Sequence, residues 1–83
     1  MNDEQQHTLR THLLDKGLDE QMVYDIMLLL RYKPDKVQLA FYYVTLGFTQ
    51  DRAAVNIGVK QATVNYYLSV QCADIKKYIE DSL

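Results

Sequence analysis

The stretch that decides the fold is Gln50-Asp-Arg-Ala-Ala-Val-Asn-Ile-Gly-Val-Lys-Gln-Ala-Thr-Val-Asn-Tyr-Tyr-Leu68. It predicts two short helices joined by a turn at Gly58, where a left-handed backbone costs little only for glycine. We expect the two helices to cross most closely at Ala54, because a larger side chain there would force them apart. The other residues that we expect to pack the helices on each other and on the core are Ala53, Ile57, Val59, Val64 and Leu68.

The outer face of the second helix carries side chains that suit the base edges of DNA. Gln61 and Asn65 can each hydrogen-bond an adenine edge through two atoms, and Ala62 or the methyl group of Thr63 can touch a thymine methyl group. No arginine is present in this helix to bind guanine, so we expect sites that contain A·T pairs. The alternative is that Asn65 and Tyr66 are ordinary solvated surface.

This motif resembles the helix-turn-helix of bacterial and phage repressors, whose second helix lies in the major groove. The longer stretch from Val37 to Ser69 is similar to the adhesin-operon regulators of the PapB type and, more distantly, to the KorA/TrfB plasmid repressors. The similarity lies in the Leu39-Ala40 pair, in Tyr43-Val44-x-x-Gly47, and in the spacing from Thr49 to Leu68. Residues 1–36 match neither family. The motif is also similar to the promoter-reading helices of sigma factors, but the chain lacks their polymerase-binding parts.

The resemblance implies a sequence-specific transcription regulator of a bacterium, phage or plasmid. We expect a repressor that binds double-stranded DNA as a homodimer or higher homo-oligomer, with a recognition helix near residues 60–69. The resemblance assigns base contacts to Gln61, Ala62, Asn65 and Tyr66, and it implies that Gln50 steadies Gln61. The alternative is a protein-interaction module, such as an anti-repressor or an antitoxin-like factor, that uses the same helix pair to hold a partner protein.

Phosphate contacts position a protein on DNA without specifying the sequence. The candidates are Thr49, Gln50, Arg52, Lys60 and Thr63, together with Lys33 and Lys36 ahead of the motif. The net charge is −2, and the acidity lies in residues 1–46, where seven acids outnumber five bases, whereas residues 47–83 hold four of each. We therefore expect a weak dependence of DNA affinity on salt, and an affinity that depends on several subunits binding together.

Start and stop signals on both sides of the motif predict an all-α fold of five or six short helices. Capping residues and the single proline predict helices that begin after Asn2 or Asp3, after Asp19, at Pro34-Asp35 and after Thr49. We expect these helices to end near Asp15, Arg31, Gly47 and Ile57. The helix from about residue 60 either runs unbroken to Asp81 or breaks near Cys72-Ala73-Asp74. We expect the break, with Asp74 capping a last helix.

The 83 residues predict one domain. Its parts are N-terminal helices in residues 1–36, the helix-turn-helix core in 37–71 and a C-terminal helix in 72–83. The helix expected from Asp19 to Arg31 is the second along the chain, and it is apolar over more than one face. The chain also holds seven tyrosines, a residue type that is enriched at interfaces. These features favour an oligomer interface on the first two helices of the chain, one of them or both. The alternative is that the tyrosines line the rim of the core.

Composition argues against several other functions. A single cysteine, Cys72, forms no disulfide within the chain and suits a reducing compartment. The polar start predicts no signal peptide, and no apolar run approaches the ~20 residues that span a bilayer. We therefore expect a cytoplasmic protein without membrane contact. His7 and His12 would lie on different faces of a helix, and no phosphate-binding loop or serine nucleophile motif is present. We expect no metal, no cofactor and no catalytic residue, and hence no enzyme.

Overall fold

The computed structural model describes residues 1–82, so that Leu83, the last residue of the expected C-terminal segment 72–83, lies outside the described residues. The elements are α1 (Asp3–Asp15), α2 (Glu20–Arg31), α3 (Asp35–Thr45), α4 (Gln50–Ile57), α5 (Gln61–Tyr66), the π-helical segment η1 (Tyr67–Gln71) and α6 (Ala73–Ser82). No strand occurs among residues 1–82, and the prediction of an all-α fold is confirmed.

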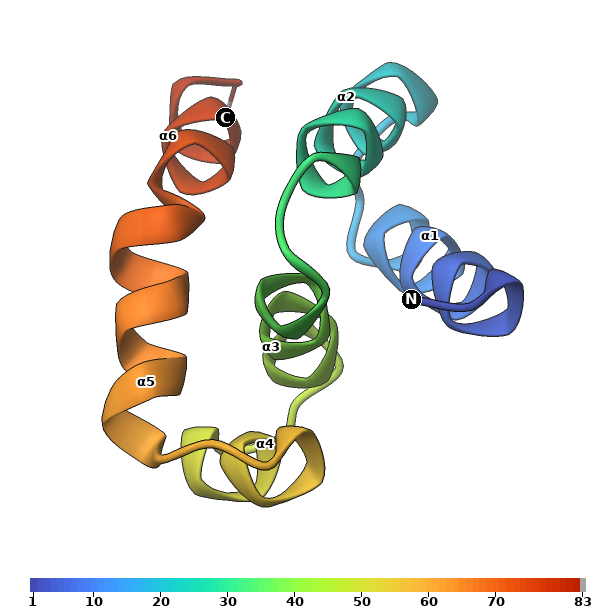
Figure 1. Ribbon diagram of the computed structural model, residues 1–83. Coiled ribbons are helices and arrows are strands. Elements are labelled where there is room, and N and C mark those ends of the chain that lie inside the picture. The colour runs from blue at the N-terminus through green and yellow to red at the C-terminus, as the bar shows by residue number, and fades with distance from the viewer. Residues whose placement is uncertain (83) are drawn as a thin grey trace.

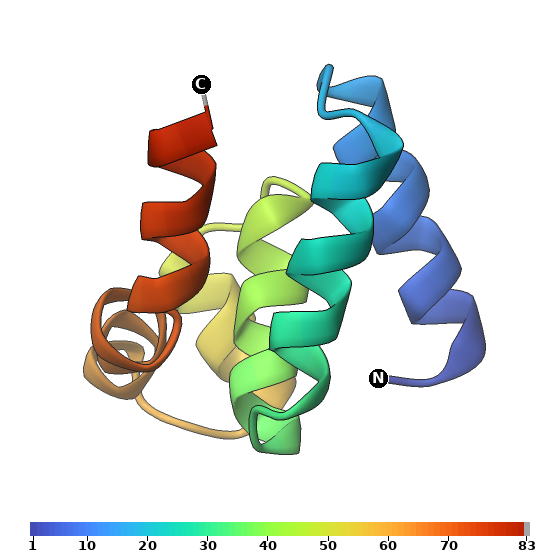
Figure 2. The ribbon, with the colours of Figure 1, turned by 90° about the horizontal axis from the view of Figure 1, so that it is seen from above.

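α1, α2, α3 and α6 run in similar directions, and the helix of α5 and η1 runs across that direction, beside α3 and α6. Figure 1 looks nearly along α2, α3 and α6, whereas α5 is seen from the side and continues into η1. In Figure 2, turned by 90°, α1, α2, α3 and α6 are seen lengthwise, and the helix of α5 and η1 is seen end-on. α4 lies against the flank of α3 and next to the start of α5, at the bottom of Figure 1. None of the helices in the described part of the chain has the length and apolar character needed to cross a bilayer.

The helix ends follow local capping chemistry. Asn2 accepts a hydrogen bond from the backbone N–H of Gln5 at 2.7 Å, and Asp19 accepts one from Met22 at 2.8 Å. These side chains satisfy backbone donors that the first turn of a helix leaves unpaired. α2 ends at Arg31, shortly before Pro34, which itself precedes the first residue of α3. The sequence analysis predicted the starts of α1, α2 and α3 from these same residues, Asn2, Asp19 and Pro34.

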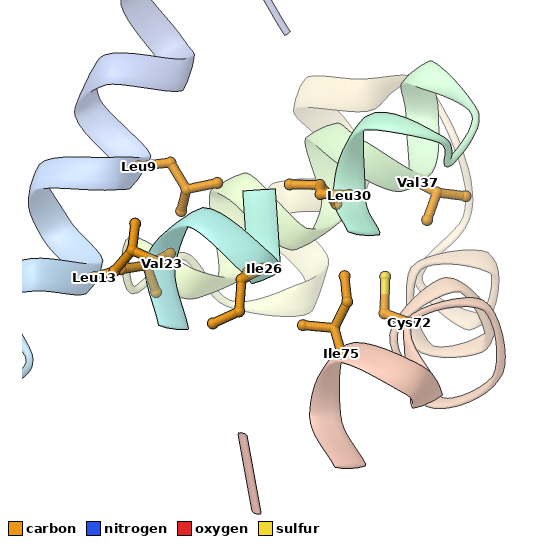
Figure 3. Close-up of a cluster of buried hydrophobic side chains, with 8 residues drawn as sticks. All are labelled: Leu9, Leu13, Val23, Ile26, Leu30, Val37, Cys72 and Ile75. Atoms are coloured by element: carbon orange, nitrogen blue, oxygen red, sulfur yellow. The ribbon is translucent and has the colours of Figure 1, made fainter. Parts of the chain in front are cut away.

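The larger of two buried clusters joins α1, α2, α3 and α6. Figure 3 shows Leu9 and Leu13 of α1 meeting α2, with Ile75 on the opposite side of α2. Its members are Leu9, Leu13, Val23, Ile26, Leu30, Val37, Cys72 and Ile75, which we call the large-residue cluster. A buried Leu or Ile side chain contributes about 1.5–3 kcal/mol. Most of the hydrophobic stabilisation of the fold therefore lies in this cluster.

The second cluster joins α3, α4 and α5 through small residues. It consists of Ala40, Ala53, Ala54 and Val64, which we call the alanine cluster. Tyr67 packs against both clusters and thereby links the end of α5 to the large-residue cluster. The site described below rests on the alanine cluster and is tied to the main core through this tyrosine.

The break expected near residue 72 is present, but its form differs from the prediction. The backbone N–H of Cys72 donates to the carbonyl oxygen of Tyr67 at 2.9 Å, which is an i→i−5 bond and defines the wide turn η1. α6 begins at Ala73, so Asp74 lies inside its first turn and does not cap it from outside as expected. The carboxylate of Asp74 instead accepts from Lys33 Nζ at 2.8 Å and from the backbone N–H of Ile75.

Two polar contacts fix α6 against the rest of the fold. Lys33, next to the end of α2, forms the ion pair with Asp74, and Tyr78 donates its hydroxyl to Asp25 of α2 at 2.6 Å. The hydrogen bond to Asp25 and partial desolvation raise the pKa of Tyr78. Partial burial raises the pKa of Asp74, but hydrogen bonds from Lys33 and from Ile75 outweigh it, so that this pKa lies below its usual value.

Candidate nucleic-acid interface

The α4–α5 pair is set by a capped start and a glycine turn. Thr49 accepts a hydrogen bond from the backbone N–H of Arg52 at 3.2 Å, which caps α4. Gly58 ends α4 with φ +83° and ψ +37°, a left-handed conformation that costs L-residues energy. The backbone N–H groups of Gly58 and Val59 both donate to the carbonyl oxygen of Ala54. The chain therefore reverses tightly enough that only residues 58–60 separate α4 from α5.

The inner side of the pair is apolar. Ala53, Ala54 and Val64 are buried in the alanine cluster. Ile57, Val59 and Leu68 are half-buried and pack against the same cluster, together with Tyr67. All the residues that the sequence analysis assigned to packing within the motif thus face inward, apart from Gly58, which has no side chain and forms the turn. The small volume of the alanines allows α3, α4 and α5 to lie close together.

The outer side of α5 presents the four residues expected to contact bases. Gln61, Ala62, Asn65 and Tyr66 are all exposed, while Val64 between them is fully buried. Their positions, at spacings of 1, 3 and 1 along a helix, place them on one surface. No side-chain hydrogen bond involving Gln61 or the Asn65 amide occurs among the described residues, so both amides are free to bind a ligand. Tyr66 is 52% exposed, with its ring available for apolar contact.

Two residues assigned to phosphate are less accessible than the rest. Gln50 and Thr63 are half-buried, whereas Thr49, Arg52 and Lys60 are exposed. Within the described chain, Gln50 and Gln61 form no hydrogen bond with each other, although the resemblance implied that Gln50 steadies Gln61. Thr49 uses its hydroxyl oxygen to cap α4, and its O–H group is still able to donate to a phosphate oxygen.

The Arg52 side chain stacks on an aromatic ring, a contact that the sequence analysis did not predict. Its guanidinium carbon lies 5.5 Å from the centre of the Phe48 ring, a cation–π distance, and Phe48 in turn packs against Tyr43 at 5.1 Å between ring centres. The signal was present in the sequence as an aromatic residue four positions before an arginine. This stacking holds the exposed cation at the start of α4 and restricts the conformations it can adopt.

Lys33 and Lys36 lie ahead of the motif and differ in availability. Lys33 is paired with Asp74, and its side chain retains only 20% of its accessible surface. Its charge is therefore already compensated, which argues against the assignment of Lys33 to a DNA phosphate. Lys36 is exposed in the first turn of α3 and has no carboxylate partner among residues 1–82.

The exposed surface of the α4–α5 pair is nearly uncharged and partly apolar. From Thr49 to Gln71 the only ionic side chains are Asp51, Arg52 and Lys60. Val55 of α4 is 82% exposed, and Val70 of η1, which the sequence analysis did not assign, is also exposed. Val70 follows Tyr66 by four residues and extends the outer face by one turn. The surface therefore offers amide groups, methyl groups and an aromatic ring, with little electrostatic attraction for phosphate.

Groups suited to other chemistry do not gather at this surface. Cys72 is buried in the large-residue cluster, and desolvation raises the pKa of its thiol to about 11, partly offset by the nearby Lys33. A thiol with this pKa stays protonated at neutral pH and is a poor nucleophile. Within residues 1–82 no three His, Cys, Asp or Glu side chains come together as metal ligands.

Comparisons of the chain with protein-family models, with curated proteins and with solved structures gave no significant match.

Proposed function

We propose that the protein is a sequence-specific DNA-binding transcription regulator, a repressor, in which α4 and α5 form a helix-turn-helix and α5 reads the major groove. The observation that carries the proposal is the division of α5 into two sides. Val64 is buried in the alanine cluster, while Gln61, Ala62, Asn65 and Tyr66 are exposed together. A short helix that exposes two amides and is supported from behind by a second helix matches what groove recognition requires.

The exposed groups predict the kind of base that is read. The side-chain amide of Gln or Asn can donate an N–H to N7 of adenine and accept a hydrogen bond from its N6 amino group, and Ala62 offers a methyl group to thymine. Both amides are unpartnered by side chains of the described chain, so that no internal hydrogen bond is lost when they bind bases. We infer operators in which A·T pairs face Gln61 and Asn65.

The cations supply position and only modest affinity. Arg52, held on the Phe48 ring, and Lys60, the residue before α5, are the exposed cations of the pair. Each phosphate neutralised contributes about −0.9 to the slope of log affinity against log salt on duplex DNA. Few such contacts per subunit give a shallow slope, and tight binding then depends on a homodimer that engages two half-sites about one helical turn apart.

Selection of duplexes from a random DNA pool tests this function. We expect wild-type protein to enrich a two-fold symmetric motif that contains A·T pairs. The matched variant is Asn65→Ala, which removes an exposed amide without touching the core, and we expect its motif to lose information at one base position per half-site. No enrichment at low salt by a folded wild-type protein would contradict the proposal.

A second candidate function is a protein-interaction module, and specific observations favour it. The net charge of −2 opposes approach to DNA, and the apolar side chains Val55, Tyr66 and Val70 are exposed on the same helix pair. Under this alternative the surface holds a partner protein, as an anti-repressor or antitoxin-like factor would. Failure of the DNA selection combined with capture of one partner protein, lost in Tyr66→Ala, would establish it.

A further inference from the structure

The side of α2 next to α1 carries a stripe of four residues whose spacing is the same when the helix is read in either direction. The stripe consists of Glu20, Tyr24, Met27 and Arg31, at spacings of 4, 3 and 4. On an α-helix these positions fall within a sector of roughly 60°, whose edge lies about 40° from the buried Val23. Met27, at that edge, is half-buried and packs against the large-residue cluster, whereas Glu20, Tyr24 and Arg31 are exposed. Tyr24 is 62% exposed although it is aromatic. The stripe therefore presents an apolar centre with an acid at one end and a base at the other.

The surroundings of the stripe show that its residues share one surface. Glu20 and Tyr24 line a hollow with Arg10 and Leu14 of α1, and Tyr24, Met27 and Arg31 line an adjoining one. Leu14 and Leu28, both partly exposed, widen the apolar area on its two sides. Tyrosine, methionine and arginine are enriched at the centres of protein interfaces.

The charges at the two ends of the stripe cannot neutralise each other within one chain. Glu20 and Arg31 are eleven positions apart, which separates them by about 16 Å along the helix axis. Neither forms a salt bridge with any other residue in the range 1–82, although Arg10 lines the same hollow as Glu20, and Asp35 the same hollow as Arg31. An interface on this surface would have to compensate both charges.

We propose that two copies of the chain associate by packing α2 antiparallel against α2 of the second copy, with the two-fold axis between Asp25 and Ile26. In this register Glu20 of each copy faces Arg31 of the other, and Tyr24 faces Met27. The 4-3-4 spacing is that of alternating core positions in a coiled coil, which pack in this way when two helices are antiparallel. The isologous contact that results uses one patch twice.

The occupant is a second copy because the reversed stripe matches the stripe in both charge and apolar content. This inference deepens the proposed function, since it locates the dimer that operator binding requires. It rests on that function only for its biological purpose, because the association itself needs no DNA. Failure of the dimer and failure of DNA binding can therefore be told apart by experiments on the free protein and on the DNA complex.

The test is charge reversal at the two ends, measured by sedimentation equilibrium of the full chain without DNA. We expect wild type to dimerise reversibly, and Glu20→Arg or Arg31→Glu to raise the dissociation constant on the order of tenfold or more, because like charges then face each other at both ends. An equimolar mixture of the two variants should recover the dimer, since one chain then carries two bases and the other two acids. The double variant E20R/R31E should recover it as well.

Two controls separate a loss of pairing from a loss of folding. Gln21→Arg and Tyr32→Glu introduce the same charges at the same ends of α2 but off the stripe, and they should leave the dissociation constant within about twofold. Circular dichroism of each variant reports whether the helices remain folded. A wild type that stays monomeric at high concentration would overturn the proposal. The proposal would also be overturned if neither single charge reversal changed the dissociation constant of the dimer, or if mixing the two variants did not restore association.

Discussion

The two buried clusters of this protein use side chains of different size for different purposes. The large-residue cluster is built mainly from Leu, Ile and Val, whose burial provides stability. The alanine cluster contains three alanines and one valine and buries little apolar area, but it lets α3, α4 and α5 approach closely. The difference teaches that close packing of small residues positions the candidate DNA surface. The burial that stabilises the fold lies mainly in the large-residue cluster, to which Tyr67 connects this surface.

The largest expected effect comes from truncation in the large-residue cluster. Ile26 is fully buried between α1 and α6, and Ile26→Ala removes methyl groups and leaves a cavity. We expect a loss of about 2–5 kcal/mol in the free energy of unfolding, measured by urea denaturation. The fraction of protein that remains folded should bind DNA as wild type does. A loss of DNA affinity beyond the loss of folded protein would contradict the separation of the two clusters.

Enlarging a residue of the alanine cluster should reduce DNA binding more than it reduces stability. Ala54→Leu inserts a branched side chain where α4 meets its neighbours, at a cost of about 1–3 kcal/mol in stability. We expect α4 and α5 to shift, so that binding to the selected operator falls by more than the stability loss explains. The control is Val55→Leu at the next position, which is 82% exposed and should change neither property. Equal effects of the two variants would refute the role given to Ala54.

A backbone substitution separates turn geometry from packing. Nothing lies within 4 Å of a Cβ atom built on Gly58, so Gly58→Ala is strained only because of its φ of +83°. We expect a destabilisation of about 1 kcal/mol, with Gly58→Asn less affected because asparagine tolerates the left-handed region better. Thermal unfolding of wild type, Gly58→Ala and Gly58→Asn measures their order of stability. An alanine variant as stable as wild type would rule out strain at the turn.

The smallest effect concerns the ion pair that ties α6 to the end of α2. The Asp74 side chain is 46% exposed, so its pairing with Lys33 contributes at most about 1 kcal/mol. Because folding lowers the pKa of Asp74 below its ordinary 3.8, the stabilisation is fully present above that pH and is lost as the pH falls through the lower folded value. Asp74→Asn should therefore be less stable than wild type at neutral pH, and the two should converge in acid. A difference that grows on acidification would contradict this assignment.

The positions of α1 to α4 could be predicted because local chemistry sets them. Asn2, Asp19 and Thr49 cap helices with side chains next to the backbone groups that they satisfy, and Gly58 ends α4 at the residue expected. The inward and outward sides of α5 also followed from helical periodicity, since Val64 is buried and its neighbours Gln61 and Asn65 are exposed.

The π-helical segment could not be predicted, because packing and not local preference explains it. In a regular α-helix Cys72, eight positions after Val64, would point roughly 80° away from it. The wide turn from Tyr67 to Gln71 contains an additional residue and rotates the chain that follows, so that Cys72 and Ile75 face the large-residue cluster. The pairing of Lys33 with Asp74 was missed for a similar reason, because the two residues are far apart in sequence.

The measurement that tests the central claim most directly compares Gln61→Ala with Arg52→Ala on the selected operator and on all of its single-base variants. Both substitutions remove exposed groups, so neither should alter the fold. Our account predicts that Gln61→Ala loses about 1–3 kcal/mol and its discrimination at one base position per half-site, whereas Arg52→Ala weakens all duplexes alike. Uniform weakening by both variants, or unchanged discrimination in Gln61→Ala, would contradict the claim that the outer face of α5 reads DNA.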